Sequence, residues 1–265
     1  MEKMKKYPSF ADILAIVGVF ILTSVVIGGI VGGVLSLAGV SQEVMMAIVY
    51  PLPMVCTALF AIFYGRGRGE KKKPALCFAL PPRHWGLVLG GLVLMLSMSV
   101  VLEPLLSLFP KEWFEWMNAQ IGRGVWTIIT TVVMASVLEE WLFRGIVQRS
   151  AENAYGPVAG ILISATVFGV IHLMPMQVIN AFALGIALGY VYYKTRSLTA
   201  VILMHAANNG LAYYMAGVGP ADATLRDALP SAGVYTALYA VCVLVVVVGV
   251  PVIFHDLGKK RAPEQ

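Results

Sequence analysis

Long apolar stretches constrain the fold of this chain more than any other feature of its sequence. A helix needs about 20 mostly apolar residues to cross a bilayer, and stretches of this kind recur along the 265 residues. Hydrophobic residues make up 59% of the chain and charged residues 12%, whereas soluble domains average about 25% charged residues. This composition excludes a soluble globular domain, a disordered chain and, with only three cysteines, a disulfide scaffold. The sequence predicts an all-α, polytopic integral membrane bundle.

We expect about eight transmembrane helices in a single membrane domain that covers residues 1–265. Their expected positions are 11–38, 43–64, 86–109, 125–148, 157–174, 176–193, 198–217 and 233–254. The fourth to seventh stretches are shorter or carry polar side chains, and 176–193 is a candidate for packing inside the protein instead of facing lipid. Glycines four residues apart, a spacing that lets helices approach closely, occur at Gly28/Gly32, Gly29/Gly33, Gly86/Gly90 and Gly185/Gly189.

Lys and Arg residues are unevenly distributed among the expected loops. With eight spans and a cytoplasmic N-terminus, fifteen of them fall on the inner side, while the outer side has only Lys111, Arg123 and Arg226. Cytoplasmic loops of membrane proteins carry such an excess of basic residues. We therefore expect both termini in the cytoplasm, in the plasma membrane of a prokaryote, and no nucleic acid as a partner despite the net charge of +5. The outer segment 111–118 is expected to form a short amphipathic helix at the interface.

Ionisable residues inside the apolar stretches are few, and each costs about 2.5–3.5 kcal/mol to insert. Glu140 and Arg144 are four residues apart on one helix, so they face the same side and suit an ion pair. Such a pair is equally consistent with fixing helix registry and with supporting a site. Glu139 is turned by about 100° from Glu140 and has no cation left on its own helix. Its charge must be met by another helix, a metal ion or water.

Two histidines lie on two further stretches. His172 follows Phe168 by four residues, so the aromatic ring is expected to form a wall of its pocket. His205 and Asn209 have the same spacing, and for this reason we expect Asn209, not Asn208, to share the His205 face. A single histidine in a membrane helix is more often a packing residue than a catalyst. Two histidines and a surplus carboxylate on three separate helices nevertheless favour a functional site.

This set of side chains supports two kinds of hydrolysis. The carboxylate of Glu139 can act as a general base on water while imidazole and carboxamide groups stabilise an oxyanion. Alternatively, Glu139, His172 and His205 can hold a Zn²⁺ ion that acidifies the same water. A third option is a cation or proton transporter, because chains of carboxylates and histidines also form proton relays.

Three motifs occur in order on successive polar stretches: Glu139-Glu140-x-x-x-Arg144, Phe168-x-x-x-His172 and His205-x-x-x-Asn209. Together they resemble the CAAX-protease and bacteriocin-processing family of intramembrane endopeptidases, which includes the type II CAAX prenyl endopeptidase. The resemblance covers about residues 125–215, which would be the catalytic core. The other helices match only in being hydrophobic.

The resemblance implies a helical bundle with a water-filled conical cavity inside the membrane. Glu139 would be the general base, His172 would help to activate the water, and His205 with Asn209 would stabilise the tetrahedral oxyanion. Glu140 and Arg144 would shape and support the site, with Phe168 beside them. No cofactor is expected to be required, because an His-Glu-x-x-His motif is absent and asparagine is a poor zinc ligand. Zn²⁺ held by the acid and the two histidines is the alternative.

The sequence thus predicts a membrane-bound hydrolase, an endopeptidase that cleaves a peptide bond of a membrane-associated protein through a Glu/His-activated water. A prenylated protein is one candidate substrate, and membrane lipid and this substrate are the expected partners. Glu139 and His205 are expected about 10–14 Å from the cytoplasmic ends of their helices, so a substrate tail is expected to approach from the cytoplasm. The alternative is a non-proteolytic membrane scaffold or bacteriocin immunity protein of the same fold. The oligomeric state is left open.

Overall fold

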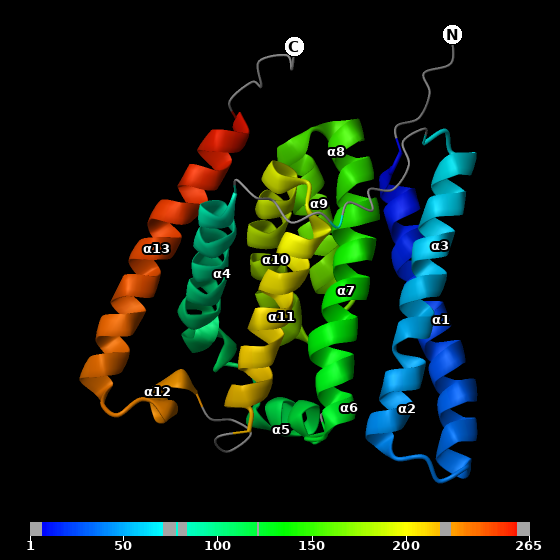
Figure 1. Ribbon diagram of the computed structural model, residues 1–265, viewed down its shortest axis with the longest axis horizontal. Helices are drawn as coiled ribbons and strands as arrows, with labels where there is room; N and C mark the ends of the chain where they lie inside the picture. The colour runs from blue at the N-terminus through cyan, green and yellow to red at the C-terminus, as the bar shows by residue number, and fades with distance from the viewer. Residues whose placement is uncertain (1–6, 71–77, 79–83, 121, 218–223, 259–265) are drawn as a thin grey trace.

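The computed structural model describes residues 7–70, 78, 84–120, 122–217 and 224–258. Every element of regular structure within these ranges is helical, which confirms the predicted all-α membrane bundle. In Figure 1, α1, α2 and α3 stand on one side of the bundle, α4 and α13 stand on the other, and α7 to α11 lie between them. The starts of α1 and α4 and the end of α13 share one end of the bundle with α8, while α5 and α12 lie at the opposite end (Figure 1). These are called the α8 end and the α5 end below.

The first helices follow the apolar stretches closely. Helix α1 (Phe10–Leu37) begins at Ser9, whose side chain forms a reciprocal cap with Asp12. The chain then returns through α2 (Gln42–Val49) and α3 (Pro51–Gly67), which adjoin at Tyr50. Helix α4 (Trp85–Leu106) runs back to the α5 end, where the amphipathic α5 (Lys111–Gln120) lies at the expected interfacial segment. Helices α12 (Leu225–Ala228) and α13 (Ala232–Gly258) complete the chain.

The central helix, Val125–Tyr155, is continuous but irregular. It consists of α6 (Val125–Thr127), the π-helical segment η1 (Ile128–Met134), α7 (Ala135–Glu140), the π-helical segment η2 (Trp141–Gln148) and α8 (Arg149–Tyr155). π-Helical turns are rare and occur frequently at functional sites. Here they flank the single regular segment that ends with Glu139 and Glu140. The helix also continues to Tyr155, well beyond the predicted end at 148.

Helices α9 (Pro157–Val170), α10 (Pro175–Thr195) and α11 (Leu198–Met215) pack against this central helix. Proline at the first position suits the starts of α9 and α10, because that position needs no amide hydrogen bond. Gly185 and Gly189 confirm the predicted close packing. A Cβ atom on Gly185 would lie 2.9 Å from Ala165 Cβ, and one on Gly189 would lie 3.0 Å from Ile161 Cγ2. By contrast, a Cβ on Gly28, Gly29, Gly33, Gly86 or Gly90 would meet nothing within 4 Å, so close packing at those pairs is not found.

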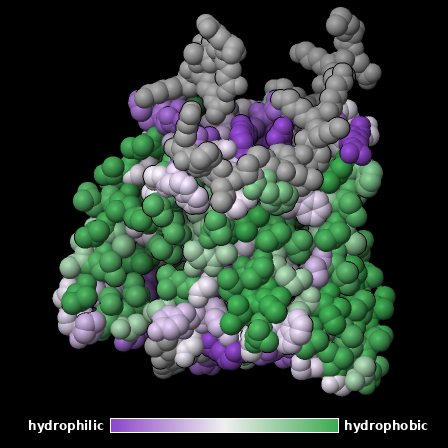
Figure 2. Space-filling model, in the orientation of Figure 1, coloured by the Kyte–Doolittle hydropathy of each residue, from purple (hydrophilic) through white to green (hydrophobic). Residues whose placement is uncertain are grey.

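Six helices in the described part of the chain are long and apolar enough to span a membrane, so the predicted count of eight is not confirmed. Helix α9 has only 14 residues, and α11 carries His205, Asn208 and Asn209. Burial also differs between spans: 67% of the α10 window is buried inside the protein, compared with 6% for α1. This confirms that the sixth predicted stretch packs inside the bundle. Figure 2 shows the corresponding exterior, an apolar belt between polar ends.

Candidate active site

A cavity of about 980 Å³ lies between the central helix and α2, α5, α10 and α11. Its volume falls at the upper end of the range for ligand sites, about 300–1,000 Å³. Its walls carry both apolar and polar side chains. The predicted site residues that line it are Glu139, Phe168, His172, His205 and Asn209, and Asn208 lines it as well. Two of the predicted residues, Glu140 and Arg144, do not line it.

Glu139 presents its carboxylate to this cavity with 6% of the residue exposed. The hydroxyl group of Tyr50 donates a hydrogen bond of 2.5 Å to Glu139 Oε1. The other carboxylate oxygen, Oε2, lies 3.7 Å from His205 Nε2. No Lys or Arg side chain forms an ion pair with Glu139 among the described residues. The carboxylate is therefore held in place while remaining available to a proton from the cavity.

Glu140 is turned away from the cavity and is fully buried, as is Arg144. Arg144 Nη1 donates to Glu140 Oε1 at 2.9 Å, and His205 Nδ1 donates to the same oxygen at 2.8 Å. Arg144 Nη2 also reaches the carbonyl oxygen of Gly185, 3.4 Å away, on the helix whose glycines permit this approach. Glu140 therefore fixes the orientation of His205 and directs its Nε2 toward Glu139.

Phe168 is the aromatic wall between these groups. Its ring makes edge-on contacts with the rings of His172 and His205, at centroid distances of 5.1 and 5.7 Å. The guanidinium carbon of Arg144 lies 4.5 Å from the centroid of the same ring, within the range of a cation–π interaction. Phe168 thus separates the buried cation from the two imidazoles and sets the spacing between the imidazoles.

His172 lies in the turn between α9 and α10, at the edge of the cavity. Its Nδ1 is 2.8 Å from the carbonyl oxygen of Phe168, which can only accept, so Nδ1 carries a proton. In the neutral ring, Nε2 is then the basic atom. The next residue, Leu173, has a φ of 63°, a left-handed conformation that a branched side chain rarely adopts. The turn that positions His172 is therefore conformationally strained.

Asn208 and Asn209 both line the cavity, which corrects the expectation that only one of them faces the site. Asn208 Nδ2 donates to Asn209 Oδ1 at 3.3 Å, and Asn209 Nδ2 donates to the carbonyl oxygen of Thr131 at 2.9 Å. Thr131 belongs to η1, so the irregular part of the central helix contacts α11 through this bond. Because Nδ2 of an asparagine carries two hydrogens, one remains for a ligand in the cavity.

Sequence reasoning missed Tyr50, which contributes the shortest contact to Glu139. The available signal was general: a phenol inside an apolar stretch needs a hydrogen-bond partner. Which partner it finds depends on the packing of α3 against α7, and Glu139 lies 89 positions away in the sequence. Gln148 was missed for the same reason. It is buried and donates to the carbonyl oxygen of Gly189 at 2.8 Å, one turn beyond the Arg144–Gly185 contact.

The described residues contain no group of three or more His, Cys, Asp or Glu side chains arranged to hold a metal ion. Glu139, His172 and His205 line one cavity without forming such a group. The donor set alone therefore does not define a zinc site, and the mechanism proposed below contains no step through a metal ion.

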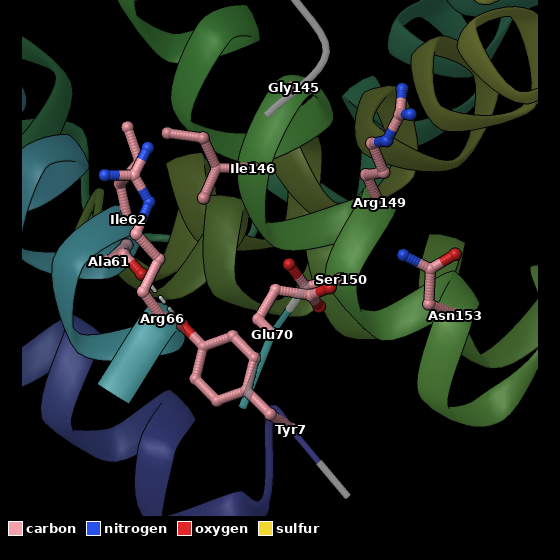
Figure 3. A pocket seen from close by; sticks show the side chains of 10 residues that line it. All are labelled: Tyr7, Ala61, Ile62, Arg66, Glu70, Gly145, Ile146, Arg149, Ser150 and Asn153. Atoms are coloured by element: carbon pink, nitrogen blue, oxygen red, sulfur yellow. Dashed lines mark hydrogen bonds between the residues drawn. The ribbon is translucent and has the colours of Figure 1, made fainter. Parts of the chain in front are cut away.

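A second, much smaller cavity of about 20 Å³ lies near the α8 end. Figure 3 shows its lining, in which Tyr7, Arg66, Glu70, Arg149 and Asn153 surround a space with room for about one water molecule. Tyr7 donates from its hydroxyl group to the carbonyl oxygen of Ala61 at 3.1 Å. Burial raises the pKa of Tyr7 well above its ordinary value, so the phenol stays neutral there. None of the predicted site residues lines this space.

The fold and the large cavity define an integral membrane protein with a carboxylate–histidine site in its interior. Residues 121–211 match the family model described as type II CAAX prenyl endopeptidase Rce1-like. The match contains all three motifs, from Glu139 to Asn209, and confirms the resemblance stated above. This part of the chain is therefore similar to that family, and the similarity suggests CAAX-type intramembrane protease activity in general. No curated protein and no solved structure matches the chain.

Proposed function

We propose that this protein is an intramembrane endopeptidase in which Glu139 activates a water molecule to attack a peptide bond. The observation that carries the proposal is the difference between two adjacent carboxylates. Glu140 is neutralised by Arg144, whereas Glu139 faces the cavity with a phenol and an imidazole as neighbours. A carboxylate in such a position is suited to take a proton from water.

The other side chains have roles that follow from their contacts. Glu139 takes a proton from the water, aided by His172, whose Nε2 is the basic atom of the neutral ring. The oxygen of the water bonds to the carbonyl carbon, and the electrons of the C=O bond move to its oxygen. His205 in its protonated form and Asn209 donate hydrogen bonds to this oxyanion. Glu139 then returns the proton to the amine nitrogen as the C–N bond breaks, which regenerates the carboxylate.

The proposed substrate is a membrane-associated protein, with a prenylated protein as one candidate. The apolar part of the lining, which includes Met46, Met95, Met117 and Leu184, supports a lipid-linked or apolar peptide over a soluble polar one. The excess of Lys and Arg in the sequence beside the α8 end supports an orientation with both chain ends in the cytoplasm, and the proposed location is the plasma membrane of a prokaryote.

The test is cleavage of a quenched fluorescent prenylated peptide by detergent-purified protein. Glu139→Gln should lower the rate by about 10²–10⁴-fold, the usual contribution of a general base. Glu112→Gln, an exposed carboxylate on α5, is the matched control and should cleave at the wild-type rate. Cleavage that survives a strong zinc chelator would support the metal-free mechanism, and loss on chelation would move the mechanism to a metal ion.

Equal cleavage by wild type and Glu139→Gln would refute the assignment of the base. If no peptide is cleaved, the biological effect of the protein decides between the two candidate functions. A scaffold or immunity protein should retain its effect with Glu139→Gln, because its function does not need a base, whereas a protease should lose it.

A further inference from the structure

Most of the large cavity lies in the half of the bundle at the α5 end. From the central helix it is lined by Thr127, Thr130, Thr131, Ala135 and Glu139, all in the half that begins at the α5 end. From α11 it is lined by residues from His205 to Ala216, which run toward the same end. No residue between 140 and 167 lines it, nor does any between 189 and 204. The buried side chains of Leu184 and Leu188 on α10 continue the lining past Glu139 toward the α8 end, so Glu139 and His205 lie in the cavity wall, short of its closed inner end.

The opening of the cavity is marked by exposed residues at the α5 end. Ser41 and Gln42 at the start of α2 are exposed, and so are Trp116 and Ala119 on α5. These residues lie close to the loops that connect the helices at that end. A molecule can therefore enter between α2 and α5 and reach Glu139 along the N-terminal half of the central helix.

In the opposite direction the site is sealed. Directly beyond Glu139 the central helix carries Glu140, Arg144 and Gln148, each with 0% exposure. Leu198 and Met204 of α11, with at most 1% exposure, close the same layer from the other side. The small cavity of about 20 Å³ near the α8 end, shown in Figure 3, does not include Glu139 or His205. The described residues thus give the carboxylate a route to the α5 end and close the route to the α8 end.

The charge pattern assigns a side of the membrane to each end. The described part of the α8 end carries Arg66, Arg68, Arg149, Lys194 and Arg196. In the sequence, fifteen Lys and Arg residues adjoin the helix termini of this end, whereas the α5 end has three. Because basic residues accumulate on the cytoplasmic side, the α8 end is the cytoplasmic end. The cavity therefore opens away from the cytoplasm.

We propose that the site is reached from the non-cytoplasmic side of the membrane, so that its substrate is an exported or outward-facing segment of a membrane-associated protein. The substrate part of this inference rests on the proposed function; the direction of access does not. It replaces the expected approach of a cytoplasmic tail. That expectation placed Glu139 and His205 about 10–14 Å from the cytoplasmic ends of their helices. The extension through α8 puts Glu139 about 24 Å from the helix end at Tyr155, whereas His205 stays about 10 Å from the start of α11 at Leu198.

The lining also indicates which segment can bind. It contains two carboxylates, Glu43 and Glu139, and no Lys or Arg among its described residues. Arg123, near the opening, donates to the carbonyl oxygens of Tyr213 and Ala216. A buried carboxylate without a cation is costly. The cavity therefore suits an apolar internal segment of a chain better than a segment that ends in a free C-terminal carboxylate.

The direction of access is tested by cysteine labelling in a variant whose native cysteines, Cys56, Cys77 and Cys242, are replaced. Three single cysteines are introduced. Ala119→Cys lies at the opening of the cavity, and Ala212→Cys lies in the cavity, one helical turn from Asn208 toward the α5 end. Gly67→Cys lies at the α8 end, where an added Cβ meets nothing within 4 Å. A membrane-impermeant maleimide is added to intact cells and, separately, to permeabilised cells. We expect the first two to label in intact cells and the third only after permeabilisation. Labelling of Gly67→Cys with protection of Ala119→Cys and Ala212→Cys in intact cells would overturn the proposal.

The substrate is tested by comparing protein termini in cells that express wild type or Glu139→Gln. Cleavage products that depend on Glu139 should map to outward-facing or exported segments and should lie inside chains rather than at their last residues. Products that map to cytoplasmic C-terminal tails would refute the substrate assignment. If the cysteines label as expected but no product depends on Glu139, the direction of access is supported and the protease function is refuted. The failure of one proposal can therefore be distinguished from the failure of the other.

Discussion

Glu139 and Glu140 are neighbours in the sequence, yet they belong to two different regions of the molecule. On the cavity side, Glu139 contacts groups that can exchange protons, a phenol and an imidazole. On the sealed side, Glu140 and Arg144 form a fully buried pair that also holds His205. A turn of about 100° around one helix therefore separates a carboxylate that lines the cavity from one that belongs to a buried ion pair.

The sealed pair is not arranged for maximal stability. Arg144 contacts Glu140 through a single nitrogen, and Glu140 Oε2 and Arg144 Nε are buried without hydrogen-bond partners among the described residues. Burying an ion pair costs desolvation free energy that imperfect geometry does not fully recover. The contact from Glu140 to His205 Nδ1 indicates what the pair provides, namely a fixed imidazole in the wall of the cavity. The two alternatives that the spacing left open, registry and support of a site, are thus compatible in one arrangement.

The largest expected effect is on the sealed side. Arg144→Leu leaves Glu140 as a buried carboxylate without its cation and should lower the free energy of unfolding by about 3–5 kcal/mol. Thermal unfolding of the detergent-purified protein measures this loss. Arg226→Leu, an exposed arginine on α12, is the control and should change stability by less than about 0.5 kcal/mol. If Arg144→Leu and Arg226→Leu are equally stable, the buried Glu140–Arg144 pair does not contribute to stability, and the proposed difference between the sealed side and the cavity side is wrong.

On the open side, His172→Ala should reduce activity and leave stability nearly unchanged. The ring is half-buried, and its one described hydrogen bond goes to a backbone carbonyl. We expect a fall in kcat of about 10²–10³-fold, as for a group that assists proton transfer, with an unfolding temperature close to that of wild type. A variant that unfolds as readily as Arg144→Leu would instead make His172 part of the packed core.

A third prediction concerns the glycine contact that supports the sealed layer. Gly185→Ala introduces a Cβ 2.9 Å from Ala165 Cβ and should destabilise the protein by about 1–3 kcal/mol through overpacking. Gly90→Ala, where a Cβ meets nothing within 4 Å, should be neutral or slightly stabilising. Unfolding of both variants under the same conditions makes the comparison. No loss of stability for Gly185→Ala relative to Gly90→Ala would show that α9 and α10 can shift apart without cost.

The smallest expected effect is on the positioning of Glu139. Tyr50→Phe removes the hydrogen bond to Oε1 and retains the ring, so the cavity keeps its shape. A hydrogen bond to a charged group contributes about 1.5–3 kcal/mol. We expect the low end of this range, a fall in kcat of about tenfold with KM nearly unchanged, because His205 still lies beside the carboxylate. Steady-state kinetics with the peptide substrate separates the two constants. A change in KM alone would assign Tyr50 to substrate binding instead of to orientation of the base.

Much of the fold and of the candidate site was predictable because it depends on local properties. The apolar stretches predicted a helical membrane bundle, since a bilayer leaves the backbone few other ways to satisfy its hydrogen bonds. The spacing of four residues correctly predicted the Glu140–Arg144 ion pair, and the position of Phe168 predicted its ring contact with His172. Periodicity failed where the helix is irregular or short: Asn208 and Asn209 both face the cavity, and α9 ends at Val170 instead of residue 174.

The sequence by itself determined that the chain forms membrane helices and which polar residues share one helix face, and its basic residues predict which end of the bundle faces the cytoplasm. Only the tertiary structure decided that the cavity opens at the α5 end, that Tyr50 holds Glu139, and that Gly185 accepts a hydrogen bond from Arg144. These facts depend on contacts between helices far apart in the sequence, and no local pattern encodes them. The end at which the cavity opens depends on which part of each helix packs against its neighbours. This packing exists only in the assembled bundle.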